Sequence, residues 1–275
     1  MINNYSVQSI VDEYQIHKMS LRALSKKLHI TDDKLKEVLI SQNIKIKPRG
    51  AERALVNDDY FSEINSEDKA YFLGLLFADG CIVDTQAYQK SLTISLQERD
   101  SYILYKMKKY LNYQGNITFK KRKQLQHKDQ ETLNITSDKL CNDLINLGCT
   151  PKKSLTLEFP NGKIPDHLMR HFIRGLFDGD GSIASQKTYK KGGEISYHFR
   201  FDISGTYSIC EGVKNVFIEH LSLKDRKIIK RKDHQVCVCA IMGKRNIQQI
   251  YHYLYDDATI FLTRKKEKML GVFAS

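Results

Sequence analysis

The sequence of 275 residues lacks any apolar run close to the length of about 20 residues that a membrane-spanning helix needs. Its first residues, MINNYSVQSIVDEYQ, do not combine a basic start with an apolar core, so they do not resemble a secretory signal. We therefore expect a cytoplasmic protein with no membrane partner.

Signatures of several enzyme and metal-site classes are also missing. The six cysteines form no C-x-x-C pair, which leaves a zinc knuckle or a redox motif unsupported. No G-x-x-x-x-G-K-[ST] loop is present to hold a nucleotide triphosphate. His167 and His171 lie four apart, but Leu168 stands where a zinc metalloprotease needs glutamate.

Acidic residues are fewer than basic ones. The chain has 44 Lys and Arg against 32 Asp and Glu, which gives a formal net charge of +12. A surplus of positive charge of this size indicates what the protein binds rather than how it folds, and nucleic acid is the commonest polyanionic partner. We therefore expect a nucleic-acid-binding protein.

Residues 1–48 are expected to form a small domain of their own. Three short segments with helical apolar spacing are joined by tight turns, a pattern similar to helix-turn-helix DNA-binding modules. Nine basic and five acidic residues precede position 51, so the net charge there is 9 − 5 = +4. Residues 49–67, which break the periodicity, are expected to be a linker.

The rest of the chain contains an internal duplication, which predicts an α+β fold of two similar units. The segment YFLGLLFADGCI, residues 71–82, returns as FIRGLFDGDGSI at residues 172–183. Each copy is followed by the same order of elements: strand, helix, hairpin and helix. We place the first repeat at residues 68–162 and the second at residues 163–275.

Small residues mark one face of each duplicated helix. Gly74 and Ala78 lie one turn apart, as do Gly175 and Gly179. Glycine inside a helix lowers helix stability by roughly 1 kcal/mol relative to alanine, so glycine at these positions indicates a structural requirement. A stripe of small residues lets two backbones approach closely, so we expect the two helices to pack against each other.

Both helices are predicted to end on an aspartate followed by a glycine: Asp79 with Gly80, and Asp180 with Gly181. The two aspartates share one offset, 180 − 79 = 101. A carboxylate at a helix C-terminus is unfavourable, and two close carboxylates repel. A divalent cation such as Mg²⁺ would offset both penalties, and metal-held carboxylates suit phosphodiester hydrolysis.

The two nonamers FLGLLFADG and IRGLFDGDG resemble the paired motifs of the monomeric LAGLIDADG homing endonucleases. The similarity extends over residues 68–275, including LINLGCTPKKSLTLEFP and FLTRKKEKML. It implies two pseudosymmetric αββαββα units forming a β-saddle on DNA. It also implies a monomer that cuts both strands of a long double-stranded target with two or three Mg²⁺ ions at the repeat interface, as in intron homing.

The same resemblance assigns site residues. It makes Asp79 and Asp180 catalytic metal ligands and assigns Gly80 and Gly181 to the same metal site. It makes Lys153, Lys265 and Glu98 further catalytic residues, with Gly205 taken as the counterpart of Glu98. One departure is the sixth motif position, which is Asp178 in the second copy and Phe77 in the first.

Basic residues near the predicted strands are expected to contact DNA, through phosphates or base edges. They are Lys120, Lys121, Arg122, Lys123, Lys190, Arg200, Lys230, Arg231 and Lys232. Two other functions stay open on the same scaffold: an RNA maturase acting in splicing, and a transcriptional regulator that binds DNA without cutting it.

Overall fold

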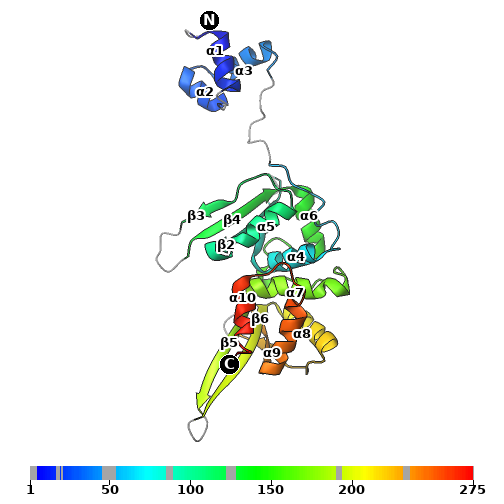
Figure 1. The fold of residues 1–275 in the computed structure, drawn as a ribbon. Helices are drawn as coiled ribbons and strands as arrows, with labels where there is room; N and C mark the ends of the chain where they lie inside the picture. Colours follow the sequence, from blue (N-terminus) through cyan, green and yellow to red (C-terminus); the bar gives the residue numbers. More distant parts are fainter. Residues whose placement is uncertain are drawn as a thin grey trace. The chain divides into compact units, whose positions relative to one another are not determined.

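The computed structural model divides the chain into two compact units, residues 1–53 and residues 54–275, which are described separately (Figure 1). The structure describes residues 5–16, 19, 21–44, 54–84, 89–121, 128–189, 194–231 and 236–274. Within these ranges no helix is long and apolar enough to span a bilayer.

The first unit is the predicted bundle of three short helices. These are α1 (Val7–Gln15), α2 (Leu21–Leu28) and α3 (Asp32–Ser41). Each contributes fully buried apolar side chains to one small core, among them Ile10, Leu24, Leu35 and Leu39. The helical spacing of these residues is therefore explained by a shared core.

The second unit contains the predicted duplication. Its first half contains α4 (Glu67–Asp79), β1 (Gly80–Val83), β2 (Ser91–Gln97), η1 (Glu98–Asp100), α5 (Tyr102–Tyr110), β3 (Thr118–Lys120), β4 (Gln130–Thr136), α6 (Asp138–Leu147) and η2 (Lys153–Leu155). Its second half contains α7 (Asp166–Asp180), β5 (Gly181–Tyr189), β6 (Ile195–Gly205), α8 (Tyr207–Leu221), β7 (Ile229–Lys230), β8 (Cys237–Met242), α9 (Lys244–Tyr255) and α10 (Thr263–Leu270). The α+β fold and the αββαββα order are confirmed.

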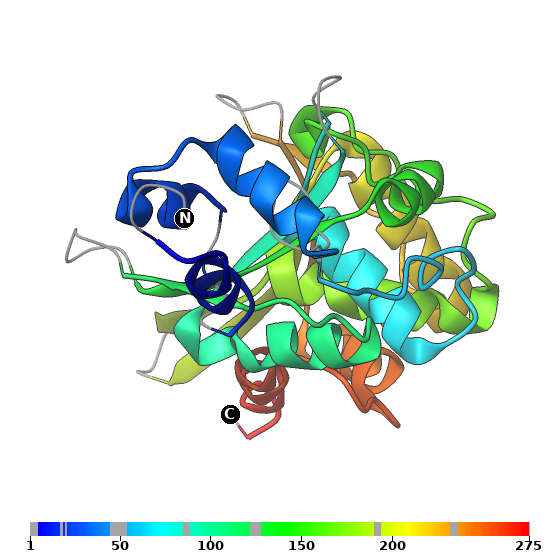
Figure 2. The same cartoon turned by 90° about the horizontal axis from the view of Figure 1, so that it is seen from above.

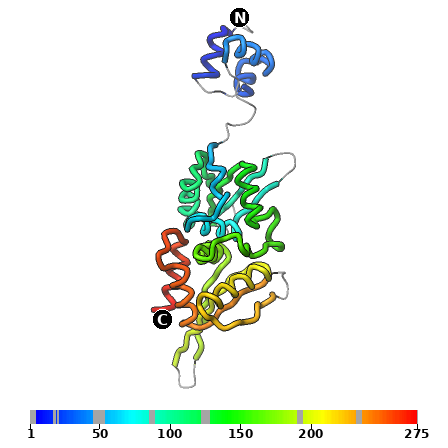
Figure 3. The backbone as a smooth tube through the Cα atoms, turned by 90° about the vertical axis from the view of Figure 1, so that its right-hand side faces the viewer, coloured from blue at the N-terminus to red at the C-terminus, as the bar shows by residue number. Residues whose placement is uncertain are grey.

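The two antiparallel sheets have the same strand order, β1-β2-β4-β3 and β5-β6-β8-β7. Gly80 pairs with Ile94 in the first sheet, and Gly181 pairs with Ile203 in the second. Alternate residues of β2 are buried against the helices, as the period-two pattern predicts, whereas in β6 Phe201, Asp202 and Ile203 are all buried. In the second half, β5 and β6 continue as a two-stranded ribbon beyond the helices (Figure 3).

The predicted linker, residues 49–67, is wrong over its second part. Tyr60, Phe61 and Ile64 are buried in the core of the second unit, and Phe61 has no exposed surface. Glu67 already belongs to α4. The segment lacks helical periodicity because it packs as irregular chain, which the sequence pattern does not distinguish from a solvated linker.

Candidate active site

The contact between α4 and α7 is built on two reciprocal glycines. A Cβ atom on Gly74 would lie 2.0 Å from the carbonyl oxygen of Phe172. A Cβ atom on Gly175 would lie 2.0 Å from the carbonyl oxygen of Tyr71. Each helix therefore presses its backbone against the other, and α4 and α7 cross the centre of the unit (Figure 2).

The contact continues to the ends of both helices. A Cβ atom on Gly179 would lie 2.3 Å from the Cβ atom of Ala78 and 3.0 Å from the Oδ2 atom of Asp79. The Asp79 carboxylate thus lies against the residue that precedes Asp180. The four small residues of the predicted stripes bring the two aspartates to one place, where both are exposed.

Gly80 and Gly181 end the two helices for a reason that the sequence analysis did not give. Their φ angles are −74° and −87° and their backbones are extended, so neither adopts the left-handed conformation of a C-terminal glycine cap. A Cβ atom on Gly80 would lie 2.6 Å from the carbonyl oxygen of Leu76, and one on Gly181 would lie 2.1 Å from the Phe177 ring. Lack of space, rather than positive φ, requires glycine here.

Lys153 and Lys265 are buried beside the two helix ends. The Lys153 Nζ atom donates to the carbonyl oxygens of Phe77 and Ala78, at 2.6 and 3.2 Å. The Lys265 Nζ atom donates to the carbonyl oxygens of Phe177, at 3.2 Å, and of Gly181. Each cation therefore satisfies carbonyl groups at the negative end of the helix that presents one aspartate.

The local charges shift the pKa values of the two aspartates. Partial burial, followed by repulsion from Asp180, raises the pKa of Asp79 to about 6, and Lys153, Lys265 and Arg264 oppose this rise. Partial burial also raises the pKa of Asp180. Both residues still present surface to solvent, so protein removes only part of their hydration.

The carboxylate oxygens of Asp79 and Asp180 are ligands that fit a magnesium-like ion rather than a zinc-like one. The described residues contain no cluster of three His, Cys, Asp or Glu side chains arranged to hold a metal. Two carboxylates leave most of a coordination shell to water and phosphate oxygens, which Mg²⁺ prefers. Of the two predicted glycine positions, the Gly181 carbonyl already accepts a hydrogen bond from Lys265.

Asp178, two residues before Asp180, has a different environment. It is fully buried and accepts hydrogen bonds from the hydroxyls of Tyr71 (2.8 Å) and Tyr255 (3.0 Å). Its third donor is the backbone amide of Leu262 (2.6 Å). Burial raises the pKa of Asp178 to about 6, although these hydrogen bonds oppose the rise. Phe77, its counterpart, packs on an aromatic ring instead.

Arg174 is a fully buried cation that the sequence analysis did not single out. Its guanidinium donates to Glu67 Oε1 of α4 at 2.6 Å and to the carbonyl oxygens of Leu254 and Ile260 at 2.8 and 2.9 Å. It also approaches His171 Nδ1 at 2.7 Å. The sequence does contain a sign of this role: an arginine stands inside the apolar segment HFIRGLF, and an arginine buried with such a segment requires hydrogen-bonding partners.

Glu98 opens η1 with an exposed side chain. Its proposed equivalence to Gly205 is wrong, because Ile94 and Ile203 hold matching registers and 203 − 94 = 109. The same offset matches Gly205 with Leu96, and Glu98 lies in η1, which has no equivalent between β6 and α8. The residue before Glu98, Gln97, has a buried Oε1 atom without a hydrogen-bond partner in the described part of the chain.

The predicted DNA-contacting residues lie in different places. Lys120 and Lys121 are exposed at the end of β3, and Arg200 lies on the sheet face opposite the helices. Lys230 pairs with Cys237 on the helix side, and its Nζ atom lies 5.8 Å from the centre of the Tyr207 ring. Arg231 follows β7 and is exposed. The positions that fall outside the described residues are Arg122, Lys123, Lys190 and Lys232.

Comparison of the sequence with family models and with curated proteins gives no match. Comparison of the structure gives clear matches. The I-LtrWI LAGLIDADG homing endonuclease bound to target DNA matches with a TM-score of 0.52 at 12% identity, over 79% of this chain and 91% of that one.

Two further solved structures agree with this result. The LAGLIDADG meganuclease I-AabMI bound to uncleaved DNA has a TM-score of 0.52 at 13% identity, over 76% of this chain and 90% of that one. The I-SmaMI LAGLIDADG homing endonuclease bound to cleaved DNA has a TM-score of 0.51 at 13% identity, over 77% and 89%. The resemblance seen in the two motifs is thus confirmed, and this chain has the fold of the LAGLIDADG homing endonucleases.

Proposed function

We propose that the chain is a divalent-metal-dependent endonuclease that cuts both strands of double-stranded DNA at a long specific site. The observation that carries this proposal is the meeting of Asp79 and Asp180. They come from equivalent helix ends held together by Gly74 and Gly175, and they are exposed although their mutual repulsion is costly.

The surface around the site supports a DNA substrate. On β2, Ser91, Thr93 and Ser95 point away from the buried face, so the first sheet offers hydrogen-bonding groups to a ligand. The excess of basic residues favours a polyanion. Because one chain supplies both aspartates, we propose that it acts as a monomer.

Each group has a proposed part in hydrolysis. Mg²⁺ held by Asp79 and Asp180 would activate water and stabilise the leaving oxygen. Lys153 and Lys265 hold the helix ends, and therefore the aspartates, in place through their carbonyl contacts. Their positive charge also lowers the pKa of Asp79, which keeps its carboxylate available to a cation at neutral pH.

We also propose that residues 1–48 form a helix-turn-helix-like DNA-binding domain that adds to the footprint. This proposal rests on the three-helix core and on the basic charge of the segment.

The test is cleavage of a randomised linear duplex library with Mg²⁺ and, separately, with Ca²⁺. Site-specific double-strand cutting in Mg²⁺ is expected, with binding alone in Ca²⁺. Asp79→Asn and Asp180→Asn should each abolish cutting and preserve binding. Asp256→Asn is the matched control, because Asp256 also stands at a helix C-terminus but its carboxylate pairs with His252 and not with either site aspartate.

Normal cutting by either site variant would overturn the metal assignment. Binding of duplex without cutting in any metal would favour a regulator. Selective binding of structured RNA instead of duplex would favour a maturase.

A further inference from the structure

Arg200 and Asp202 form a close ion pair on β6. The Arg200 Nε and Nη2 atoms donate to Asp202 Oδ2 at 2.9 and 2.7 Å. The Asp202 side chain is 8% exposed, whereas that of Arg200 is 41% exposed. The buried carboxylate therefore holds one edge of a guanidinium whose remaining part faces solvent.

The pair lies on the face of the second sheet opposite the core. Phe199, Phe201 and Ile203 point to the core, so the alternate residues Arg200 and Asp202 point to the opposite face. The cross-strand neighbours of Arg200 are Ala184 and Met242, which offer no charged group to compete for it.

The hydrogen bonds made by this pair leave a defined set of donors. Arginine has five N–H donors, and Asp202 engages those of Nε and one of Nη2. The outward edge, formed by Nη1 and Nη2, is the edge that bonds the O6 and N7 acceptors of guanine in the major groove. The carboxylate behind Arg200 cancels much of its charge, which disfavours a phosphate and favours a neutral base edge.

A groove of about 380 Å³ adjoins the pair and has Arg226 and Lys227 in its lining. The one acidic residue of this lining, Asp225, is already paired with Lys214 at 2.8 Å. Arg226 and Lys227 are thus placed to contact phosphates beside the base that Arg200 would reach.

We propose that Arg200 reads a guanine in the half of the target bound by the second repeat, with Asp202 as its positioning residue. The proposal rests on the proposed function and deepens it. The equivalent residues of the first sheet, from 200 − 109 = 91 and 202 − 109 = 93, are Ser91 and Thr93. Serine and threonine thus stand in the first sheet where Arg200 and Asp202 stand in the second, so this arginine–aspartate pair has no counterpart at the equivalent described positions, and we place the guanine contact in one half of the target.

The experiment is selection of bound duplexes from a randomised library in Ca²⁺, which measures binding without cleavage. The wild-type chain should enrich a guanine at one position. Arg200→Ala and Arg200→Lys should each reduce that preference roughly 5- to 150-fold, the worth of one bidentate contact, while the other positions keep theirs. Lysine should lose the preference because its three donors share one nitrogen, so an ammonium held at Asp202 offers guanine no fixed planar pair of donors.

Asp202→Asn tests the positioning role. It should weaken the same single preference and leave the others unchanged, which a general loss of folding would not do. Lys227→Ala is the matched control, and it should lower affinity for all sequences alike and reduce the dependence of binding on salt.

The proposal would be overturned if both Arg200 variants kept every base preference of the wild-type chain and only bound all sequences more weakly. That result would assign Arg200 to a phosphate contact. Enrichment of no sequence by the wild-type chain would instead refute the proposed function, and this proposal with it.

Discussion

The Asp178 carboxylate accepts a 2.8 Å hydrogen bond from the Tyr71 hydroxyl, which joins the second duplicated helix to the first inside the core. Asp180, one half-turn later, points to the exposed place where Asp79 also lies. Two carboxylates on one helix therefore have separate roles, one in packing and one in the proposed chemistry.

Asp178→Asn and Asp180→Asn should accordingly give opposite results. At position 178 an amide would face hydrogen-bond donors with its own N–H groups, which should lower the free energy of unfolding by about 3 kcal/mol. Cutting of DNA below the unfolding temperature should persist. Asp180→Asn should remove cutting without a loss of stability. Calorimetry and a cleavage assay on both variants check this, and equal loss of cutting by both variants would contradict it.

Gly74→Ala and Gly175→Ala should each lower the free energy of unfolding by about 2 kcal/mol or more, because each methyl group would overlap a backbone carbonyl oxygen of the partner helix. Gly271→Ala is the control: the nearest atom to its Cβ position is 3.5 Å away, so it should be neutral or slightly stabilising. Urea unfolding followed by circular dichroism measures the difference. A midpoint unchanged in the first two variants would argue against close packing of α4 on α7.

Lys153→Met and Lys265→Met should each reduce cutting about 100-fold, because the cation near the aspartates is lost. Each should also destabilise by about 1–3 kcal/mol, since buried carbonyl oxygens lose their donor. Lys268→Ala, an exposed lysine of α10, should change neither quantity. Single-turnover cleavage rates at saturating enzyme separate the chemical effect from weaker binding. Rates equal to wild type would limit both lysines to a structural role.

His171 should make the protein less stable in acid. Burial and the neighbouring Arg174 lower the pKa of His171 to about 4, whereas the unfolded chain takes up this proton near pH 6.5. Stability from this residue is therefore complete above pH 6.5 and declines as the pH falls toward 4.

His171→Asn keeps a hydrogen-bond acceptor for Arg174 and cannot titrate. The difference in unfolding free energy between wild type and variant should shrink by roughly 2–3 kcal/mol from pH 7 to pH 4. Asp79 and Asp178 titrate oppositely, with raised pKa values, but they do so in both proteins and cancel in the difference. A difference that does not change with pH would show that His171 is already charged in the folded state.

Removal of the first unit should weaken DNA binding in a way that depends on where the deletion ends. Its described helices carry five basic and five acidic residues, so the net charge of +4 comes from Lys18, Lys45, Lys47 and Arg49. Deletion of residues 1–44 should therefore weaken binding with little change in its salt dependence, and deletion of residues 1–53 should also reduce that salt dependence. Binding isotherms at several salt concentrations measure this, and equal slopes for both deletions would refute it.

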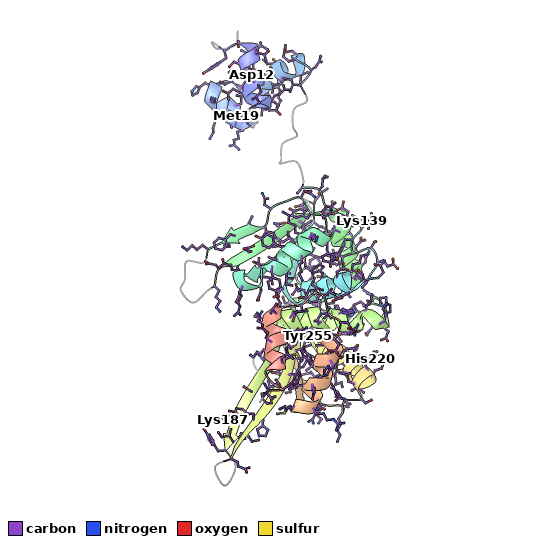
Figure 4. All side chains as sticks on the ribbon, in the orientation of Figure 1. Asp12, Met19, Lys139, Lys187, His220 and Tyr255 are labelled. Carbon is purple, nitrogen blue, oxygen red and sulfur yellow. The ribbon has the colours of Figure 1, made fainter. Side chains whose placement is uncertain are left out.

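Lys187 and Tyr255 lie outside the proposed site and serve as reference positions for the measurements of affinity and stability. Lys187 lies far along the β5–β6 ribbon, and its Nζ atom sits 5.1 Å from the centre of the Tyr189 ring (Figure 4). Tyr255, by contrast, is buried, and its hydroxyl donates a hydrogen bond to Asp178 of α7 (Figure 4). Substitutions at Lys187 should affect affinity alone, whereas those at Tyr255 should affect stability.

The sequence by itself determined the duplication, the period of the strands and helices, and the two glycine-aspartate helix ends. These features depend on neighbours along the chain: alternation in β2 and β6, spacing of four in the small stripes, and repetition at a fixed offset. From them followed two similar α+β units and the candidate aspartates, whereas the αββαββα order was implied by the family resemblance of the two motifs.

Only the tertiary structure decided what depends on residues far apart in the chain. It placed Asp178 among donors from Tyr71, Tyr255 and Leu262, gave Arg174 its partners, and showed that lack of space rather than positive φ requires glycine at Gly80. A side chain's partners across a core are not encoded in its local pattern, because burial and hydrogen bonding arise only when distant segments pack.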